Sequence, residues 1–110
     1  MGAARKILGQ AIPAATTLTA LYTVPASGST VCSTLCVCNQ STTQTTFRVS
    51  VAISGATDTP AQYLYYDVVI NGKDTFMATI GITLFAGDII RVYVGTANVS
   101  FNVFGEETTP

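Results

Sequence analysis

Residues 61–94 constrain the fold of this chain more than any other stretch. They hold three apolar runs, AQYLYYDVVI, TFMATIGITLF and IIRVYV, separated by two short turn-like segments. Asn71-Gly72 in the first segment is a strong hairpin signal, because both central residues of a type I′ turn need positive φ. Gly87 in the second segment is expected to take positive φ in another tight turn. We therefore predict a β-meander here, with the other segments packed on it or beside it.

Four further segments show the apolar and polar alternation that is typical of half-buried strands. They cover residues 14–24, 30–38, 47–54 and 99–103, and turn residues or polar loops such as 39–45 separate them. Seven or eight strands without a convincing helical pattern predict an all-β chain. We expect a single antiparallel β-sandwich, with either a jelly-roll or an Ig-like Greek-key topology.

Parity along each predicted strand assigns side chains to faces. In residues 30–38, one face is expected to carry Val31, Leu35 and Val37. The opposite face is expected to carry Cys32, Thr34, Cys36 and Cys38. In residues 47–54, the core-facing set is expected to be Phe47, Val49, Val51 and Ile53, with Arg48, Ser50, Ala52 and Ser54 outside.

The three cysteines lie in one short strand, which suits neither a disulfide framework nor a zinc site. We interpret them as free thiols that act as small hydrophobes, which fits assembly in a reducing cytoplasm.

The 110 residues are enough for one domain. We divide the chain into an N-terminal arm (1–12), a β-sandwich domain (13–105) and a short acidic tail (106–110). The arm carries the adjacent cations Arg5 and Lys6, and it is expected to be either disordered or held by a neighbouring subunit. Its basic start resembles a signal peptide, but Gly9, Gln10 and Pro13 break the apolar region, so secretion is not expected.

Charged residues make up 10% of the chain, well below the share in a typical soluble domain, and none occurs between Ile7 and Phe47. A Thr- and Ser-rich β surface could be soluble without them. Alternatively, other subunits cover much of the surface, since charge is depleted at the cores of interfaces. The scattered basic residues argue against nucleic acid as a partner, and no apolar run is long enough to span a bilayer.

The chain contains no histidine, which removes most general-base, triad and metal-site designs. Asp67 is the sole acid within a predicted strand, and no partner acid is evident. The cations Arg48, Lys73 and Arg91 are expected to form rim pairs with Asp67, Asp74 or Asp88. We therefore expect no catalytic residue, no cofactor, no metal and no enzymatic activity.

Tyr63 and Tyr65 are expected to share one face of their strand, next to Asp67. This aromatic row could fill a subunit interface, stack on sugars, or simply cover a wet edge of the core.

Several runs together resemble a family of small β-sandwich proteins among the virion components of tailed bacteriophages. They are LYTVPA, VCSTLCVCN, FRVSVAISGA, QYLYYDVVINGKDTFMATIGITLFAGDIIRVYV and VSFNVFGEE, which span residues 21–107. The run ITLFAGDIIRVYV also resembles, more generally, a hairpin of tumour-necrosis-factor-like jelly rolls. Neither pattern contains catalytic residues.

The resemblance implies a structural protein of the virion, assembled in the host cytoplasm. Our leading hypothesis is a capsid decoration or cement protein that self-associates as a trimer or ring and binds other virion proteins, such as the major capsid protein. The alternatives are a neck, collar, tail or baseplate protein, or a carbohydrate-binding adhesin module on a fibre. The residues expected at interfaces are Arg5, Lys6, Cys32, Thr34, Cys36, Tyr63 and Tyr65.

Overall fold

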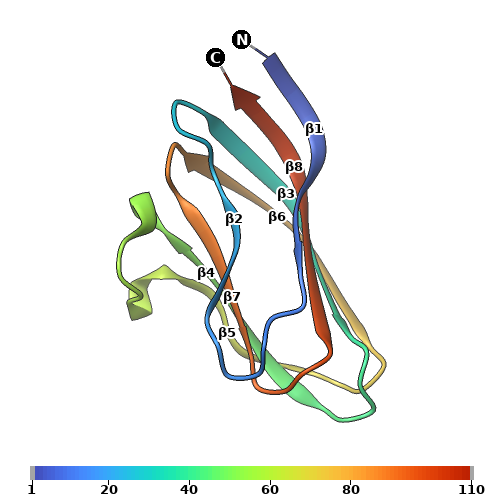
Figure 1. Ribbon diagram of the computed structural model, residues 1–110. Helices are drawn as coiled ribbons and strands as arrows, with labels where there is room; N and C mark the ends of the chain where they lie inside the picture. Colours follow the sequence, from blue (N-terminus) through green and yellow to red (C-terminus); the bar gives the residue numbers. More distant parts are fainter. Residues whose placement is uncertain (1, 110) are drawn as a thin grey trace.

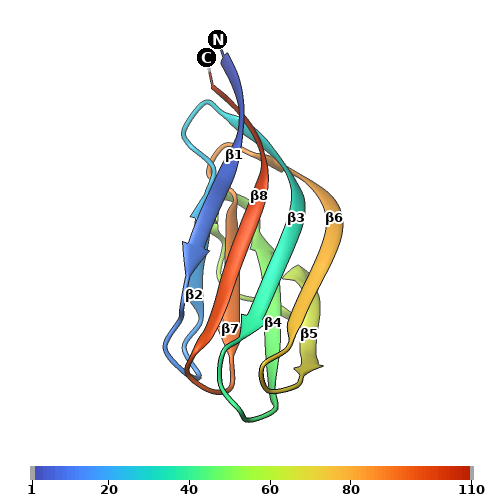
Figure 2. The same cartoon turned by 90° about the vertical axis from the view of Figure 1, so that its right-hand side faces the viewer.

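Eight strands form two four-stranded antiparallel sheets in the computed structural model, which describes residues 2–109 (Figures 1 and 2). The strands are β1 (Gly2–Ala11), β2 (Thr19–Thr23), β3 (Ser29–Asn39), β4 (Thr45–Ala52), β5 (Tyr63–Ile70), β6 (Thr75–Phe85), β7 (Ile89–Val94) and β8 (Val99–Thr109). Two short 3-10 helices, η1 (Ile53–Gly55) and η2 (Pro60–Gln62), interrupt the connection from β4 to β5. The predicted all-β sandwich is confirmed.

The strand order identifies the topology. Sheet A has the order β1-β8-β3-β6, and sheet B has the order β2-β7-β4-β5. The hydrogen-bonded pairs β1–β8, β2–β7, β3–β6 and β4–β5 are nested around the β4–β5 connection. The chain is thus one long antiparallel ribbon that doubles back on itself and wraps around the core, which is a jelly roll rather than an Ig-like Greek key.

The predicted meander over residues 61–94 is wrong, although its three apolar runs are strands. Strands β5 and β7 belong to sheet B, whereas β6 belongs to sheet A, so the chain crosses between the sheets twice (Figure 2). The first crossing is no type I′ hairpin: positive φ falls on Lys73 (60°) instead of Asn71 and Gly72. The Lys73 N–H donates to the Ser41 carbonyl (2.8 Å), so this connection is fastened to another loop instead of to its own strands. Gly87 does take positive φ (82°), as predicted.

The core lies between the sheets and is built around Phe47. Its ring centroid lies 5.3 Å from that of Phe76 and 6.1 Å from that of Phe101, both of which belong to sheet A. The same core contains almost completely buried valines of β3, β4, β7 and β8, among them Val37, Val49, Val92 and Val103. Burial of this apolar surface is the main force that holds the two sheets together.

A β-bulge at Ser33 corrects the predicted faces of β3. From Cys32 to Thr34, β3 advances two residues while β8 advances one, from Gly105 to Phe104, so Ser33 is the extra residue. Over the same span β6 advances three residues, from Ile82 to Thr79, so relative to β6 the extra residue lies on β6. An extra residue inverts parity in a strand, so the side chains on either side of it change faces. Cys32 is therefore buried and Val31 is 45% exposed, while Leu35 stays in the core.

The predicted faces of β4 hold for Phe47 and Val49, and Val51 also packs against the core, but Ser50 and Ala52 depart from the pattern. Ser50 and Ala52, which were expected outside, are fully buried, because η2 packs against β4 and η1 against β7 at this end of sheet B. Ile53 was expected in the core but is 78% exposed, because β4 ends at Ala52 and η1 begins.

The two ends of the chain pair with each other. Residues 2–11, expected as an arm, form edge strand β1, which pairs with β8 from Gly2–Thr109 to Ala11–Phe101. Residues 106–109 of the expected tail continue β8. Burial of Leu8 and pairing of Ile7 with Phe104 explain why the segment is held within its own sheet. Residues 1 and 110 of these segments lie outside the described residues, and contact of the arm with a neighbouring subunit stays a prediction.

Candidate interaction surfaces

The outward-facing side of sheet A is a broad surface with little charge. The register places its side chains in rows across the four strands, and we call this set the sheet A face: Arg5, Ile7, Gln10, Val31, Thr34, Cys36, Met77, Thr79, Thr83, Phe85, Asn102, Phe104 and Glu106. Its hydrophobic members include Met77 (65% exposed) and Phe85 (71% exposed). Its two charged members pair with each other across β1 and β8, with Arg5 Nε 3.5 Å from Glu106 Oε2.

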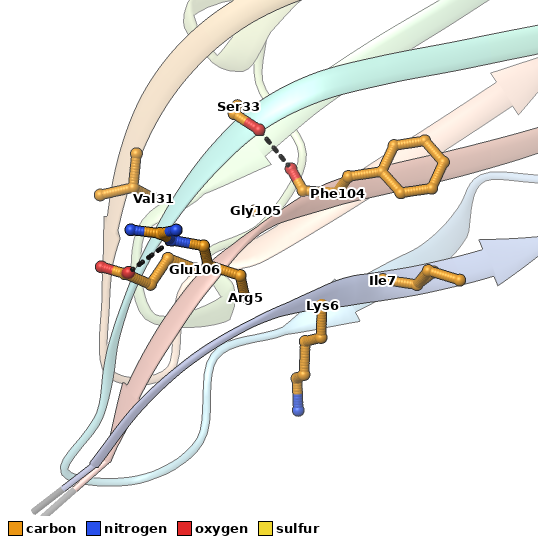
Figure 3. Close-up of a pocket in the computed structure, with 8 residues that line it drawn as sticks. All are labelled: Arg5, Lys6, Ile7, Val31, Ser33, Phe104, Gly105 and Glu106. Carbon is orange, nitrogen blue, oxygen red and sulfur yellow. Dashed lines mark hydrogen bonds and ion pairs between the residues drawn. The ribbon is translucent and has the colours of Figure 1, made fainter.

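A shallow groove of about 620 Å³ crosses this face over β1, β8 and β3 (Figure 3). Gly105 forms part of its floor, opposite the bulge, where any Cβ would meet the carbonyl oxygen of Val31. The Ser33 hydroxyl donates to the Phe104 carbonyl (3.2 Å) and so pairs the bulge with β8. Figure 3 shows Arg5 and Glu106 pairing at one end of the groove, while the Lys6 side chain points away from them.

The structure separates the residues that the sequence grouped on this side. Thr34 and Cys36 lie on the sheet A face, as expected, but the bulge places Cys32 in the core with no exposed surface. Burial raises the pKa of both the Cys32 and the Cys36 thiol, which disfavours the reactive thiolate. Phe104 and Met77 were missed, because β8 and β6 were not known to flank β3.

The outward-facing side of sheet B is centred on Arg48. Its guanidinium carbon lies 4.2 Å from the centroid of the Tyr66 ring and 4.6 Å from that of the Tyr93 ring. Its Nε and Nη2 donate to Asp67 Oδ1 (2.6 Å) and Oδ2 (3.3 Å), which is one of the rim pairs that the sequence left open. This hydrogen bonding raises the pKa of Arg48 above its already high ordinary value. Asp67 has a positive φ of 52°, at a register shift between β4 and β5 that brings it beside Tyr66 and Arg48.

A cleft of about 430 Å³ opens next to this cluster, between β5 and the β4–β5 connection. We call it the tyrosine cleft, and its lining residues are Arg48, Asp58, Thr59, Pro60, Tyr63 and Tyr66. The Tyr63 and Tyr66 rings are nearly perpendicular (87°), with centroids 5.1 Å apart. The Tyr63 hydroxyl donates to Asp58 Oδ2 (3.0 Å), and the pKa of Tyr63 is raised by burial and by this bond.

Tyr65 does not accompany Tyr63. Its ring packs inward against Phe47 and Phe76, with centroid distances of 6.3 and 5.4 Å. The ladder pairs Val49 with Tyr65 but Ser50 with Tyr63, so one step along β4 matches two along β5. The predicted aromatic row is therefore replaced by the pair Tyr63 and Tyr66.

Arg91 also departs from the predicted rim pairs. Its guanidinium donates to the carbonyl oxygens of Ala56 (2.8 Å) and Gly55 (3.3 Å), and so fastens the β4–β5 connection to β7. Asp88 instead accepts from the backbone N–H groups of Ser54 (2.9 Å) and Phe85 (2.8 Å).

Within residues 2–109, no group of three His, Cys, Asp or Glu side chains could hold a metal ion. The same part of the chain has no helix long and apolar enough to cross a membrane. Comparison with protein-family models, curated proteins and solved structures found no match for this chain.

Proposed function

We propose that this protein is a non-enzymatic structural protein of a bacteriophage virion, which decorates the assembled capsid and stabilises it. The runs that resemble phage virion proteins support the class. The jelly-roll topology is compatible with it, since this topology recurs in viral capsid domains, but it also occurs in lectins and cupins and does not assign a function by itself.

The sheet A face is the observation that carries the proposal. It combines exposed hydrophobic side chains with Thr, Asn and Gln, and its one ion pair is largely exposed. Large exposed apolar patches rimmed by polar groups mark interaction sites, and depletion of charge is typical of interface cores. A second copy of this chain, in a trimer or ring, and the major capsid protein are the partners we assign to it.

Stabilisation would follow from mass action. A protein that binds the assembled shell and not its free subunits shifts the equilibrium towards the shell, and many copies multiply the effect. A neck, collar, tail or baseplate position would use the same face against a different partner, so the particle component that binds the protein distinguishes these placements.

Charged substitutions on the sheet A face test the proposal. We expect the wild-type protein to self-associate in sedimentation and to bind purified particles of its source phage. Val31→Arg and Met77→Arg should abolish both properties while leaving the thermal unfolding temperature nearly unchanged, because both side chains are exposed. Val69→Arg, at a residue 58% exposed on sheet B, is the matched control and should behave as wild type. A wild-type monomer that does not bind the particles would overturn the proposal.

A further inference from the structure

We propose that the tyrosine cleft is a binding site for a neutral saccharide, a function independent of the contacts assigned to the sheet A face. The cleft differs from the Tyr63–Tyr65 row suggested by the sequence, because Tyr65 belongs to the core. Its size is within the range of small-molecule sites, and it combines aromatic walls with a few polar groups that could fix the orientation of a ligand.

The charges around the cleft favour a ligand without net charge. Arg48 and Asp58 line it, Asp67 pairs with Arg48, and Arg91 bonds the Ala56 carbonyl of the β4–β5 connection, so the segments around the cleft carry two cations and two anions. Arg48 is already neutralised by its bidentate pair with Asp67, which lowers its value as an anion site. A cationic ligand would be repelled by Arg48, which lines the cleft.

The polar and apolar groups match the two sides of a pyranose ring. Tyr66 lines the cleft and is 59% exposed even with Arg48 stacked on its ring, so its exposed ring surface can pack against the apolar C–H side of a sugar. Asp58 uses Oδ2 to accept from Tyr63 and remains exposed, so its carboxylate can accept from sugar hydroxyls. The Arg48 ion pair uses Nε and Nη2, which leaves Nη1 outside that pair as a donor.

The site is held in place before any ligand arrives. Tyr66 stacks on Arg48, Arg48 stacks on Tyr93, and Asp58 fixes the Tyr63 ring. A rigid aromatic wall lowers the entropic cost of binding.

Nuclear magnetic resonance titration of the full-length protein provides the test. The probes are the methyl glycosides of glucose, galactose, mannose, rhamnose and N-acetylglucosamine, with N-acetylneuraminic acid as the anionic contrast. At least one neutral sugar should shift the ring resonances of Tyr63 and Tyr66. Tyr66→Leu and Asp58→Asn should each weaken that binding by about tenfold or more, since loss of a stacked ring or of a charged acceptor costs on the order of 1.4 kcal/mol.

Val69→Ala, on the same strand but outside the cleft, is the control and should bind as wild type. The absence of ring shifts with all five neutral sugars would overturn the proposal, as would binding that both cleft variants retain. A response confined to N-acetylneuraminic acid would refute the charge argument. Asp58→Asn preserves side-chain shape, so it keeps the test decisive if Tyr66→Leu fails to fold.

Discussion

At the scale of single residues, Tyr22 is the buried end of a polar chain that joins the sheets. Its hydroxyl lies 2.7 Å from Thr30 Oγ1 and donates to Glu107 Oε2 (2.5 Å), while Lys6 Nζ lies 2.8 Å from Glu107 Oε1. Tyr22 belongs to sheet B, whereas Thr30, Glu107 and Lys6 belong to sheet A. The bonds from Lys6 and Tyr22 lower the pKa of Glu107, and burial together with Glu107 raises the pKa of Tyr22 to about 12.

These shifts predict a pH window for stability. Because the pKa of Glu107 is lower in the folded state, its contribution is complete above the ordinary value of 4.5 and is lost as the pH falls through the folded value. The raised pKa of Tyr22 acts at the other end: its contribution is complete below 10.0 and is lost as the pH rises through about 12. Glu107→Gln should lower the free energy of unfolding by about 2 kcal/mol near neutral pH, and this difference should shrink below pH 4.5.

Urea unfolding of both proteins across this acid range measures the effect. Glu106→Gln is the neighbouring control, because its pair with Arg5 is exposed and long, and such pairs contribute little. If the free energies of unfolding of wild type and Glu107→Gln differ by the same amount at every pH, then the contacts with Lys6 and Tyr22 do not lower the pKa of Glu107.

At the scale of elements, the bulge on β3 depends on a glycine of the partner strand. Gly105 pairs with Cys32, next to the extra residue Ser33. A Cβ on Gly105 would collide with the Val31 carbonyl oxygen and come within 2.9 Å of the Cys32 Cα. Because both obstacles are backbone atoms, a side chain can be accommodated only if the two strands separate.

Gly105→Ala should therefore destabilise the protein by roughly 1–3 kcal/mol, the usual cost of overpacking. The decrease is measurable as a lower midpoint of urea unfolding with an unchanged slope. Gly2→Ala, where a Cβ would meet nothing within 4 Å, should leave the midpoint in place. Equal urea midpoints for wild type, Gly105→Ala and Gly2→Ala would show that β3 and β8 can separate at the bulge at little cost in free energy.

The same bulge marks the limit of what periodicity can predict. Alternation located the strands other than β1, together with the core residues Phe47, Val49 and Leu35, because side chains along a strand return to the same face every two residues. It could not place Cys32 or Val31, since one inserted residue inverts the faces without changing the composition. It also could not tell a hairpin from a crossing between sheets, because Asn71-Gly72 serves either kind of turn. The tyrosine cleft could not be predicted either, because a register shift between β4 and β5 brings Arg48 and Tyr66 together.

At the scale of the whole molecule, β3 ends on the side of the sandwich opposite the chain termini (Figure 1). At this end of β3, Asn39 ties the two sheets together. It was predicted to begin a polar loop, but it is the last residue of β3 and is fully buried. Its Nδ2 donates to the carbonyl oxygens of Thr43 (2.8 Å), Asn71 (3.2 Å) and Ile70 (3.4 Å). Its Oδ1 accepts from the backbone N–H (3.1 Å) and the hydroxyl (2.7 Å) of Ser41.

Removal of this amide should therefore weaken the β3–β4 and β5–β6 connections at the same time. Asn39→Ala removes the amide donor to the Ile70 and Asn71 carbonyls and the acceptor of the Ser41 backbone N–H. The Thr43 carbonyl keeps the Ser41 hydroxyl as a donor (3.1 Å). We expect a loss of about 3 kcal/mol in the free energy of unfolding. Asn39→Asp keeps the shape and the acceptor but replaces the donor with a charge that faces carbonyl oxygens. It should cost at least as much at neutral pH and recover partly in acid, where a protonated carboxyl can again donate. Asn102→Ala, on the sheet A face, is the control and should change the free energy of unfolding little. If chemical unfolding gives the Asn39 and Asn102 variants the same free energy of unfolding, the sheets are held at this end by apolar packing alone.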